Sequence, residues 1–422
     1  MRIPIVSSDC HIGLALPAHK DYLERAHHEE LARFIVRVAP MMDASQRVKT
    51  TVRTYLTVDR VERMRAFSDQ ISSDNDRRIK ELESDGVVGE VLFADAASVP
   101  FAGPFGNAEA RDGDELARVL AGQRSHNRWL AEFVDPSRQV GVALINYADL
   151  AVAVREVYWA AAAGLRSVSL NGIQTNVRPP WDDHYTPLWN ALEDTGLPIS
   201  LHGGSGTALA QPHRANDRIS QSEGSPEPPA LMWAVHLTEG LLSSHRPLWF
   251  FIWGGVLERH PSLKLVFTEQ GSGWIPRALA FMDWQWEYSA HSESTLIPRR
   301  PSEYWHRQCF TGASIMTHHE VAHRSDIGVD TMMFGTDFPH PEGTLGRTVE
   351  YLNHVLSGSD ITEHEVRAIV GENTARCYGL DMKHMQSLAD RVGPTIDELL
   401  IASSAPVEPE TTMWAAKPSF VF

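Results

Sequence analysis

The chain has 422 residues, of which 43% are hydrophobic and 22% charged, a balance typical of a globular protein with an ample core. Its formal net charge of −16 excludes nucleic-acid backbones and anionic membrane surfaces as expected partners, because like charges repel. With only three cysteines, no evident signal peptide and no apolar run of about 20 residues, we expect a cytoplasmic protein that acts on a small molecule.

The first predicted strand begins at residue 3, and chemically active side chains follow its apolar part. Asp9 and His11 are two residues apart, so extended backbone projects both side chains to the same side. A carboxylate and an imidazole that face a common point can bind a divalent metal. A hydrogen-bonded structural pair has the same pattern, so these two residues alone do not decide between the alternatives.

Seven further apolar runs predict short buried strands. They lie at residues 87–93, 140–145, 167–170, 198–202, 263–269, 308–311 and 331–337. Helices are predicted between them, among them 149–163, 187–194, 231–258 and 275–288. Eight strands that alternate with helices indicate an α/β fold, a (β/α)8 TIM barrel with a parallel sheet covered on both faces. A doubly wound open sheet is the alternative, but the Gly-rich turn that normally follows its first strand is missing.

The chain is predicted to form a single domain over residues 1–400. We expect insertions at about 14–86 and 203–258, the first of them helical and too long for an ordinary connection. A helical segment outside the barrel is expected at about 361–400, and residues 401–422 are expected to form an irregular tail.

Polar side chains stand at the predicted ends of four strands: Asp9 and His11, His202, Glu269, and Asp337. The carboxyl ends of the strands of an α/β barrel meet on one face, where catalytic groups lie. Carboxylates gathered there would repel one another, and a divalent cation would remove that repulsion. We therefore expect Asp9, His11, His202 and Asp337 to bind one divalent metal ion, with zinc as the first choice and iron or manganese as alternatives.

Four motifs at these strand ends resemble the amidohydrolase superfamily. They are Asp9-Cys10-His11, Leu201-His202-Gly203-Gly204, Glu269-Gln270-Gly271-Ser272-Gly273-Trp274-Ile275-Pro276 and Phe334-Gly335-Thr336-Asp337-Phe338-Pro339-His340. The chain is most similar to the amidohydrolase-2 branch, which contains aminocarboxymuconate-semialdehyde decarboxylase and related aromatic-acid decarboxylases. The resemblance runs from residue 3 to about 400 and implies a metal-dependent enzyme that forms a homodimer.

Two departures from the family pattern influence the predicted reaction. The first motif of the family often begins with histidine, where this chain has Asp9, and the decarboxylases end their sixth strand with a catalytic histidine, where this chain has Glu269. Hydrolysis of an amide, ester, lactone or thioester with a bulky apolar or aromatic acyl group is therefore the leading hypothesis. In it, Asp337 binds the metal and accepts a proton from the activated water, and Glu269 shares the proton transfer.

Two alternatives to hydrolysis remain open. The first is non-oxidative decarboxylation of an aromatic or unsaturated acid, in which the metal holds the carboxylate and a neighbouring hydroxyl. The second is a metal-holding binding protein without catalytic activity.

Three further residues are candidates for substrate contact. Arg178, after the fourth strand, can clamp an anionic group, although a surface salt bridge is the simpler interpretation. His340, three residues beyond Asp337, can orient a ligand or meet the substrate. Trp274 belongs to a tryptophan-rich stretch that predicts an apolar pocket wall, a subunit interface or ordinary packing between helices.

Overall fold

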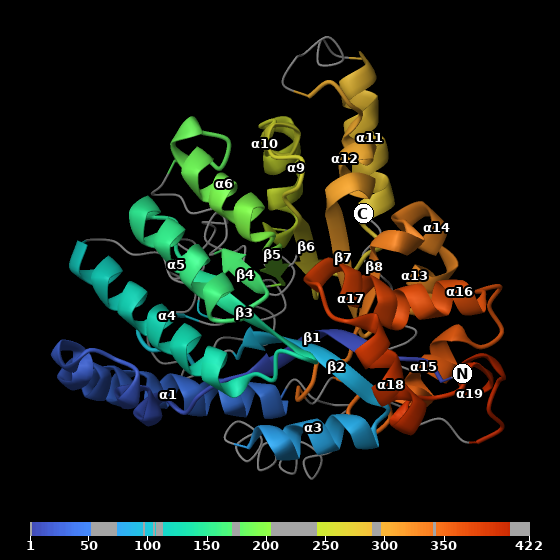
Figure 1. Cartoon of the computed structure of the whole chain (residues 1–422), viewed down its shortest axis with the longest axis horizontal. Coiled ribbons are helices and arrows are strands. Elements are labelled where there is room, and N and C mark those ends of the chain that lie inside the picture. The colour runs from blue at the N-terminus through green and yellow to red at the C-terminus, as the bar shows by residue number, and fades with distance from the viewer. Residues whose placement is uncertain are drawn as a thin grey trace.

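The computed structural model describes residues 2–51, 74–95, 98–103, 106, 113–170, 178–203, 243–288, 297–340 and 343–405. Within them, eight parallel strands follow one another in sequence order and form a nearly closed barrel with helices around it (Figure 1). The strands are β1 (Ile5–Ile12), β2 (Val87–Ala94), β3 (Gln139–Ile145), β4 (Ser167–Leu170), β5 (Ile199–His202), β6 (Leu265–Thr268), β7 (Cys309–Ser314) and β8 (Met332–Gly335). The predicted (β/α)8 barrel is confirmed.

The strands are buried on both faces, which explains why β2, β3 and β8 are almost entirely apolar. Every residue of each strand except β7 is buried. Val142, Val266 and Met333 belong to one hydrophobic cluster, whereas Leu92 and Ile145 belong to the other large cluster. This two-sided burial is characteristic of parallel sheets covered by helices.

The barrel closes next to the predicted site. Cys10 of β1 forms a parallel bridge with Phe338, which follows β8. The His11 N–H donates to the Phe338 carbonyl at 2.6 Å, and the Asp337 N–H donates to the Asp9 carbonyl at 3.0 Å. The backbone hydrogen bonds that join the first strand to the last therefore also fix the segments that carry Asp9, His11 and Asp337.

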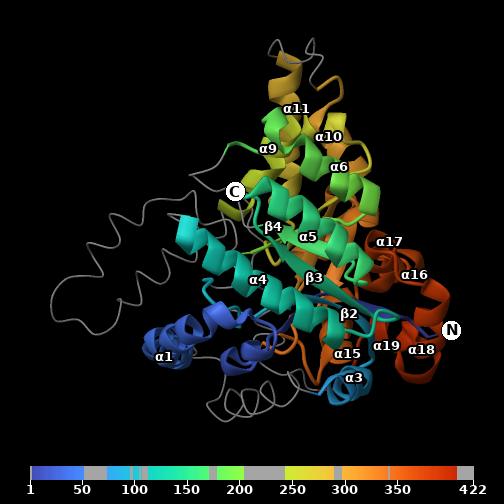
Figure 2. The same cartoon turned by 60° about the vertical axis from the view of Figure 1, so that its left-hand side comes forward.

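The helices follow the strand order. Between β1 and β2 lie η1 (Leu16–Asp21), η2 (Arg25–His27), α1 (His28–Thr51) and α3 (Asn75–Ser84). The next elements are α4 (Gly113–Phe133), α5 (Leu150–Ala162), η4 (Asp183–Tyr185), α6 (Thr186–Thr195), α9 (Arg246–Trp253), α10 (Val256–Arg259), α11 (Ile275–Tyr288), α12 (Pro301–Gln308), α13 (His318–Ala322), α14 (Arg324–Ile327), η7 (Val329–Thr331) and α15 (Thr348–Leu356). The last are α16 (Glu363–Arg367), η8 (Ala368–Glu372), α17 (Asn373–Tyr378), α18 (Met382–Val392) and α19 (Ile396–Leu400). Figure 2 shows α16 to α19 gathered outside the barrel, on the side of the N-terminus.

Local sequence signals account for several of these boundaries. Helix α6 has Pro187 in its first turn and ends at Gly196, whose φ of 67° is the left-handed conformation that glycine adopts easily. The helix predicted at 275–288 coincides with α11, whereas only residues 243–258 of the helical run predicted at 231–258 are described.

Some predictions about the organisation of the chain remain open. The single domain over residues 1–400, its two insertions and the homodimer stay predictions, and residues 204–242 and 406–422 lie outside the described part. In the described residues, no helix is both long and apolar enough to span a membrane.

Candidate metal centre

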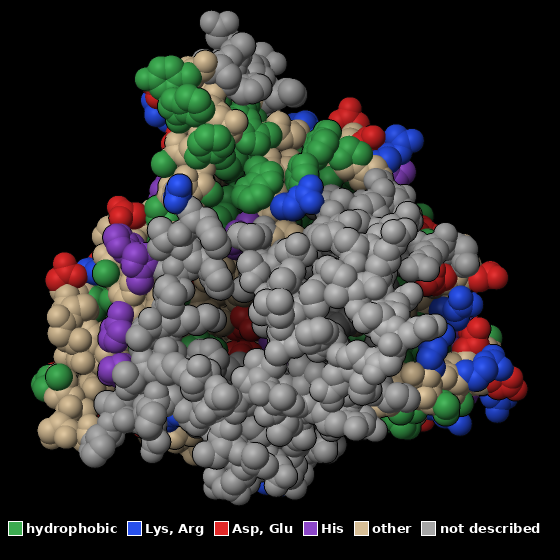
Figure 3. Space-filling model, turned by 180° about the vertical axis from the view of Figure 1, so that it is seen from behind, with side chains coloured by type: hydrophobic (Ala, Val, Ile, Leu, Met, Phe, Trp, Pro, Cys, Tyr) green, Lys and Arg blue, Asp and Glu red, His purple; other side chains and the backbone are tan. Residues whose placement is uncertain are grey.

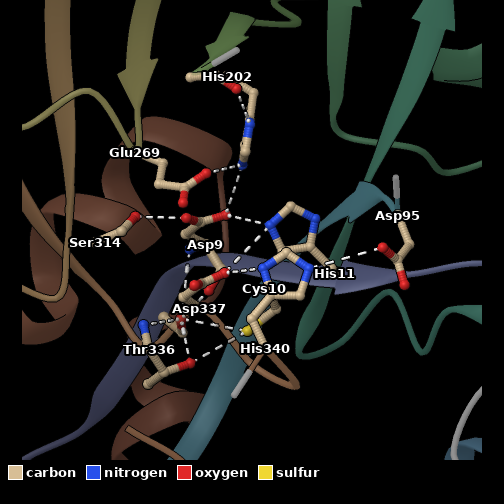
Figure 4. Close-up of polar contacts among 12 residues, drawn as sticks. Asp9, Cys10, His11, Asp95, His202, Glu269, Ser314, Thr336, Asp337 and His340 are labelled. Carbon is tan, nitrogen blue, oxygen red and sulfur yellow. Dashed lines mark hydrogen bonds and ion pairs between the residues drawn. The ribbon is translucent and has the colours of Figure 1, made fainter. Parts of the chain in front are cut away.

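The structure brings together the five polar residues predicted at strand ends. The His11 Nε2 atom lies 3.6 Å from Asp9 Oδ1 and 3.3 Å from Asp337 Oδ1. The His202 Nε2 atom lies 3.5 Å from Asp9 Oδ1 and 3.2 Å from Glu269 Oε2. Figure 4 shows the five side chains, from β1 and from the ends of β5, β6 and β8, pointing toward one another.

These distances fit a shared metal ion. Two atoms bound at about 2.1 Å to one ion, at about 90–109° to each other, are separated by about 3.0–3.4 Å. The four N···O distances of 3.2–3.6 Å lie in or just above this range and are longer than most direct N–H···O hydrogen bonds. The ligand atoms of Asp9, His11, His202 and Glu269 all lie within 4.8 Å of one another, and those of Asp337 form a second group of this kind with His11 and His340, so the predicted ligand Asp337 joins the cluster through His11. This mixed nitrogen and oxygen set fits one divalent metal.

The tautomer of His202 directs a lone pair into the cluster. Its Nδ1 lies 2.8 Å from the Gly203 carbonyl oxygen, which only accepts, so Nδ1 carries the proton. The Nε2 atom, which lies between Asp9 and Glu269, is then the nitrogen that can bind a metal. For His11, burial and the neighbouring His340 lower the pKa to about 3, so this ring is neutral at pH 7, as a metal ligand must be.

The carboxylates strongly affect the charges in the cluster. Burial acts to lower the pKa of His202, but Asp9 and Glu269 outweigh it and raise the pKa to about 9. Burial also acts to raise the pKa of Asp9, yet His202 and His11 hold that pKa below its ordinary value. Without a metal, therefore, a protonated His202 takes the place of the cation between the carboxylates.

Glu269 differs from the other carboxylates in its exposure. Its side chain is 34% exposed, whereas those of Asp9 and Asp337 are fully buried. Burial of the carboxyl group and the nearby Asp337 raise the pKa of Glu269 to about 7. Acidic side chains are visible near the centre of one face of the molecule (Figure 3). Among the carboxylates of the cluster, Glu269 thus combines a partly exposed side chain with a raised pKa.

Two of the site residues have a strained backbone. Glu269 has a φ of 54° and Asp337 a φ of 55°, in the left-handed region that side chains other than glycine rarely adopt. Backbone hydrogen bonds hold both in place: Glu269 N–H donates to the Gly312 carbonyl at 3.1 Å, and Asp337 N–H donates to Asp9. Strain of this kind is concentrated at functional sites, where the surrounding structure maintains it.

The secondary candidates lie in different environments. His340 stacks on His11 with ring centroids 4.0 Å apart, and its Nδ1 lies 2.8 Å from Asp337 Oδ1. Trp274 is buried, its ring stacks on that of His245 with centroids 3.9 Å apart, and its indole N–H donates to the Gly271 carbonyl. Arg178 is exposed and forms an ion pair with Asp182 at 3.3 Å. Only His340 touches the cluster, so substrate contacts of Trp274 and Arg178 stay predictions.

The amidohydrolase family model matches residues 75–380, which is well over half of the chain. The chain belongs to the amidohydrolase family. The 5-carboxyvanillate decarboxylase of Sphingomonas paucimobilis has a similar structure, with 19% identity, a TM-score of 0.58 and coverage of 90% of this chain and 100% of that one. An amidohydrolase of Mycobacterium avium subsp. paratuberculosis gives 18% identity, a TM-score of 0.65 and coverage of 91% and 100%.

A third similar structure contains a metal. It is a dihydroxybenzoic acid decarboxylase of Polaromonas sp. with bound manganese and the inhibitor 2-nitroresorcinol, at 17% identity, a TM-score of 0.59 and coverage of 90% of this chain and 99% of that one. No curated protein matches this chain. At these identities the likeness to solved structures establishes the fold.

The comparisons correct the predicted reaction. The sequence favoured hydrolysis because Glu269 stands where the decarboxylases have a histidine. The solved structures similar to this chain are mainly decarboxylases of hydroxylated aromatic acids, so the prediction of a hydrolase is wrong. The error arose because the substitution at position 269 was given more weight than the four motifs that resemble the amidohydrolase superfamily.

Two residues that support the site were not predicted from the sequence. The Ser314 hydroxyl, at the end of β7, donates to Asp9 Oδ2, and the buried Arg78 of α3 donates to the His11 carbonyl at 3.1 Å. The rule that polar residues at strand ends meet would have found Ser314. No local pattern identifies Arg78, which lies in a charged helix that looks solvated.

Replacing Ser314 with alanine should weaken metal binding by about 10- to 100-fold, because Asp9 loses the hydrogen bond that orients its carboxylate. The dissociation constant can be measured by titrating the apo-protein with Mn²⁺. Ser387→Ala is the matched control, since that hydroxyl donates to the carbonyl of His384 on the exposed face of its own helix, α18. Equal affinity of the Ser314 and Ser387 variants would show that Ser314 does not orient Asp9.

Gly203 should not tolerate a side chain. A Cβ at this position would lie 2.3 Å from the backbone oxygen of Glu269, so Gly203→Ala must displace Glu269. We expect kcat to fall about 100-fold, the typical effect of a shift of about 1 Å in a catalytic group. In the control Gly113→Ala, apart from its own helix no described atom lies within 4 Å of the added carbon. Steady-state kinetics that give both variants the wild-type kcat would rule out this close packing.

Proposed function

We propose that this amidohydrolase is a metal-dependent, non-oxidative decarboxylase of hydroxylated aromatic acids. The observation that carries the proposal is the pairing of buried nitrogen and oxygen ligands, from Asp9, His11, His202 and Asp337, with the partly exposed side chain of Glu269, whose pKa is raised by burial and by the nearby Asp337. A decarboxylase needs both a cation for the substrate carboxylate and a proton for the ring carbon. The decarboxylases with similar barrels support the same reaction.

Asp9, His11, His202 and Asp337 would hold the ion. When bound, the metal supplies a positive charge that holds the substrate carboxylate and its neighbouring hydroxyl. Three carboxylates and two imidazoles around the site suit manganese as well as zinc. We propose manganese as the first ion to test, because one similar decarboxylase contains it.

The proton balance assigns a role to Glu269. Non-oxidative decarboxylation breaks the bond between the ring carbon and the carboxylate, releases CO2 and puts one proton on the ring carbon. Burial and the nearby Asp337 raise the pKa of Glu269, which favours its protonated form, so this carboxyl group is the one that can transfer a proton to the carbon. The electron pair of the broken bond returns to the ring, so no oxidant or reductant is needed, and Glu269 is protonated again from solvent.

Asp337 and His340 keep the cluster in order. Asp337 is fully buried, and His340 Nδ1 lies 2.8 Å from its Oδ1. The stacking of His340 on His11 also limits rotation of the His11 ring. We assign His340 as a positioning residue for Asp337 and His11.

Replacing Glu269 with glutamine should lower kcat by about 10²- to 10⁴-fold, the usual effect of losing a general acid, while the protein keeps one metal ion. Asp337→Asn is the matched comparison, because the same change at a ligand should reduce metal content. Both quantities are available from metal analysis and steady-state kinetics of the two purified variants. Wild-type kcat in Glu269→Gln would remove Glu269 from the reaction.

A substrate panel tests the function itself. The manganese-loaded protein should release CO2 from one or more dihydroxybenzoates or carboxyvanillates, and should leave the methyl esters and amides of the same acids intact. The metal-free protein is the control and should release none. Ester or amide cleavage without release of CO2 would overturn the proposal.

A further inference from the structure

A second group of side chains of the types that can bind metals lies outside the barrel mouth, on α13 and at its C-terminal end. Residues His319-Glu320-Val321-Ala322-His323 match the pattern H-E-x-x-H. On the helices of metalloproteases, this spacing places two histidines on one face to bind zinc and uses the glutamate as a general base. Because such a short motif also occurs by chance, the structure must show where each side chain points.

The structure separates the glutamate from the histidines. Glu320 is buried and accepts hydrogen bonds from Ser272 N–H at 2.7 Å, from Ser272 Oγ at 2.6 Å and from Thr317 N–H at 2.8 Å. These bonds tie α13 to the segment that follows β6 and commit the carboxylate to the interior. Glu320 is therefore not available as a general base, and a protease-like reaction is excluded.

The two histidines, in contrast, lie close together at the surface. The His323 N–H donates to the His319 carbonyl at 3.0 Å, so the residues are one helical turn apart, and their ring centroids are 4.3 Å from each other. The His323 side chain is 48% exposed. Histidine side chains are visible on the side of the molecule that α13 to α15 occupy (Figure 3).

Asp326 gives this pair a second feature of metal sites. Its Oδ2 lies 3.3 Å from His323 Nδ1, the arrangement in which a carboxylate fixes the tautomer of a ligating histidine. With the proton on Nδ1, the lone pair of His323 is on Nε2. Neutral imidazoles spaced like this are ligands for zinc, nickel and copper ions.

We propose that His319 and His323 form a second divalent-metal site, in which both side chains bind a zinc-type ion, Asp326 orients His323 and water completes the coordination. The hydrogen bonds of Glu320 and Thr317 hold α13 in place, so little order has to be created when the ion binds. The site is independent of the proposed decarboxylation.

Zinc titration of the full-length protein without an affinity tag tests the proposal. The wild type should bind one equivalent of Zn²⁺ more than His319→Gln or His323→Gln, and added Zn²⁺ should raise the Tm of the wild type more than that of either variant. The double variant His318→Gln/His354→Gln is the matched control, because it removes another imidazole pair of the same surface, with centroids 4.9 Å apart. It should bind zinc like the wild type.

Each outcome tests either the zinc site as a whole or the orienting role of Asp326. The site would be overturned if the wild type, His319→Gln and His323→Gln bound the same number of zinc ions with the same affinity. It would also be overturned if only the His318→Gln/His354→Gln control lost the additional zinc ion. Asp326→Asn should weaken the extra site by roughly tenfold. Unchanged affinity in Asp326→Asn would overturn the orienting role of Asp326.

Discussion

Replacing His202 with alanine is expected to remove the divalent metal and, with it, decarboxylation. The Nε2 atom of His202 lies 3.5 Å from Asp9 and 3.2 Å from Glu269, so its loss leaves two carboxylates without the nitrogen ligand between them. A catalytic metal contributes several kcal/mol to the transition state, so kcat/KM should fall by about 10³-fold or more. Metal content should fall from one ion per chain to almost none after dialysis.

An exposed histidine provides the control for this variant. His184 lies in η4, outside the cluster, and His184→Ala should keep both the metal and the activity. Inductively coupled plasma analysis and CO2 release can be measured on the same samples. A His202→Ala protein that retained one tightly bound metal ion would show that this residue is no ligand.

Replacing Arg78 with methionine should cause the largest loss of stability. Arg78 is fully buried and forms two hydrogen bonds to Glu90 of β2, at 2.9 and 2.6 Å, and one to the His11 carbonyl. It also lies over the Phe338 ring at 4.5 Å. Removing it leaves the carboxylate of Glu90 buried without its cation, which typically costs about 3–5 kcal/mol. The free energy of unfolding from urea denaturation measures the effect.

Two further variants separate the buried ion pair from a general effect of losing an arginine. The double variant Arg78→Met/Glu90→Leu should recover much of the stability, because neither buried charge remains. Arg33→Met is the surface control: its partner Glu29 is 3.9 Å away and both are exposed, so the change should stay below about 1 kcal/mol. Equal losses in Arg78→Met and Arg33→Met would contradict the structural role of Arg78.

The barrel and the composition of the site could be predicted because both follow from local rules. Short runs with alternate apolar residues, such as Ser167-Val168-Ser169-Leu170, were predicted as strands, and the observed β4 has the same bounds. Once eight strands are placed in sequence order, barrel geometry brings their ends together. Polar residues at those ends, such as His202 and Asp337, must then be neighbours, even though they are far apart in the chain.

Other features depend on contacts that no local pattern encodes. The link from Arg78 to His11 joins α3 to β1 across the barrel wall, and the buried role of Glu320 depends on Ser272 in a distant segment. The left-handed backbone of Glu269 is likewise set by the packing around it. Sequence reasoning therefore placed Glu269 correctly but misjudged which reaction it favours.

The most direct test of the account is a crystal structure of the manganese-loaded protein with anomalous diffraction data. We predict one strong anomalous peak at the mouth of the barrel, within about 2.0–2.3 Å of His11 Nε2, His202 Nε2 and at least one oxygen each of Asp9 and Asp337. The absence of a peak there, in crystals that hold manganese elsewhere, would contradict the central claim that these strand ends bind the catalytic ion.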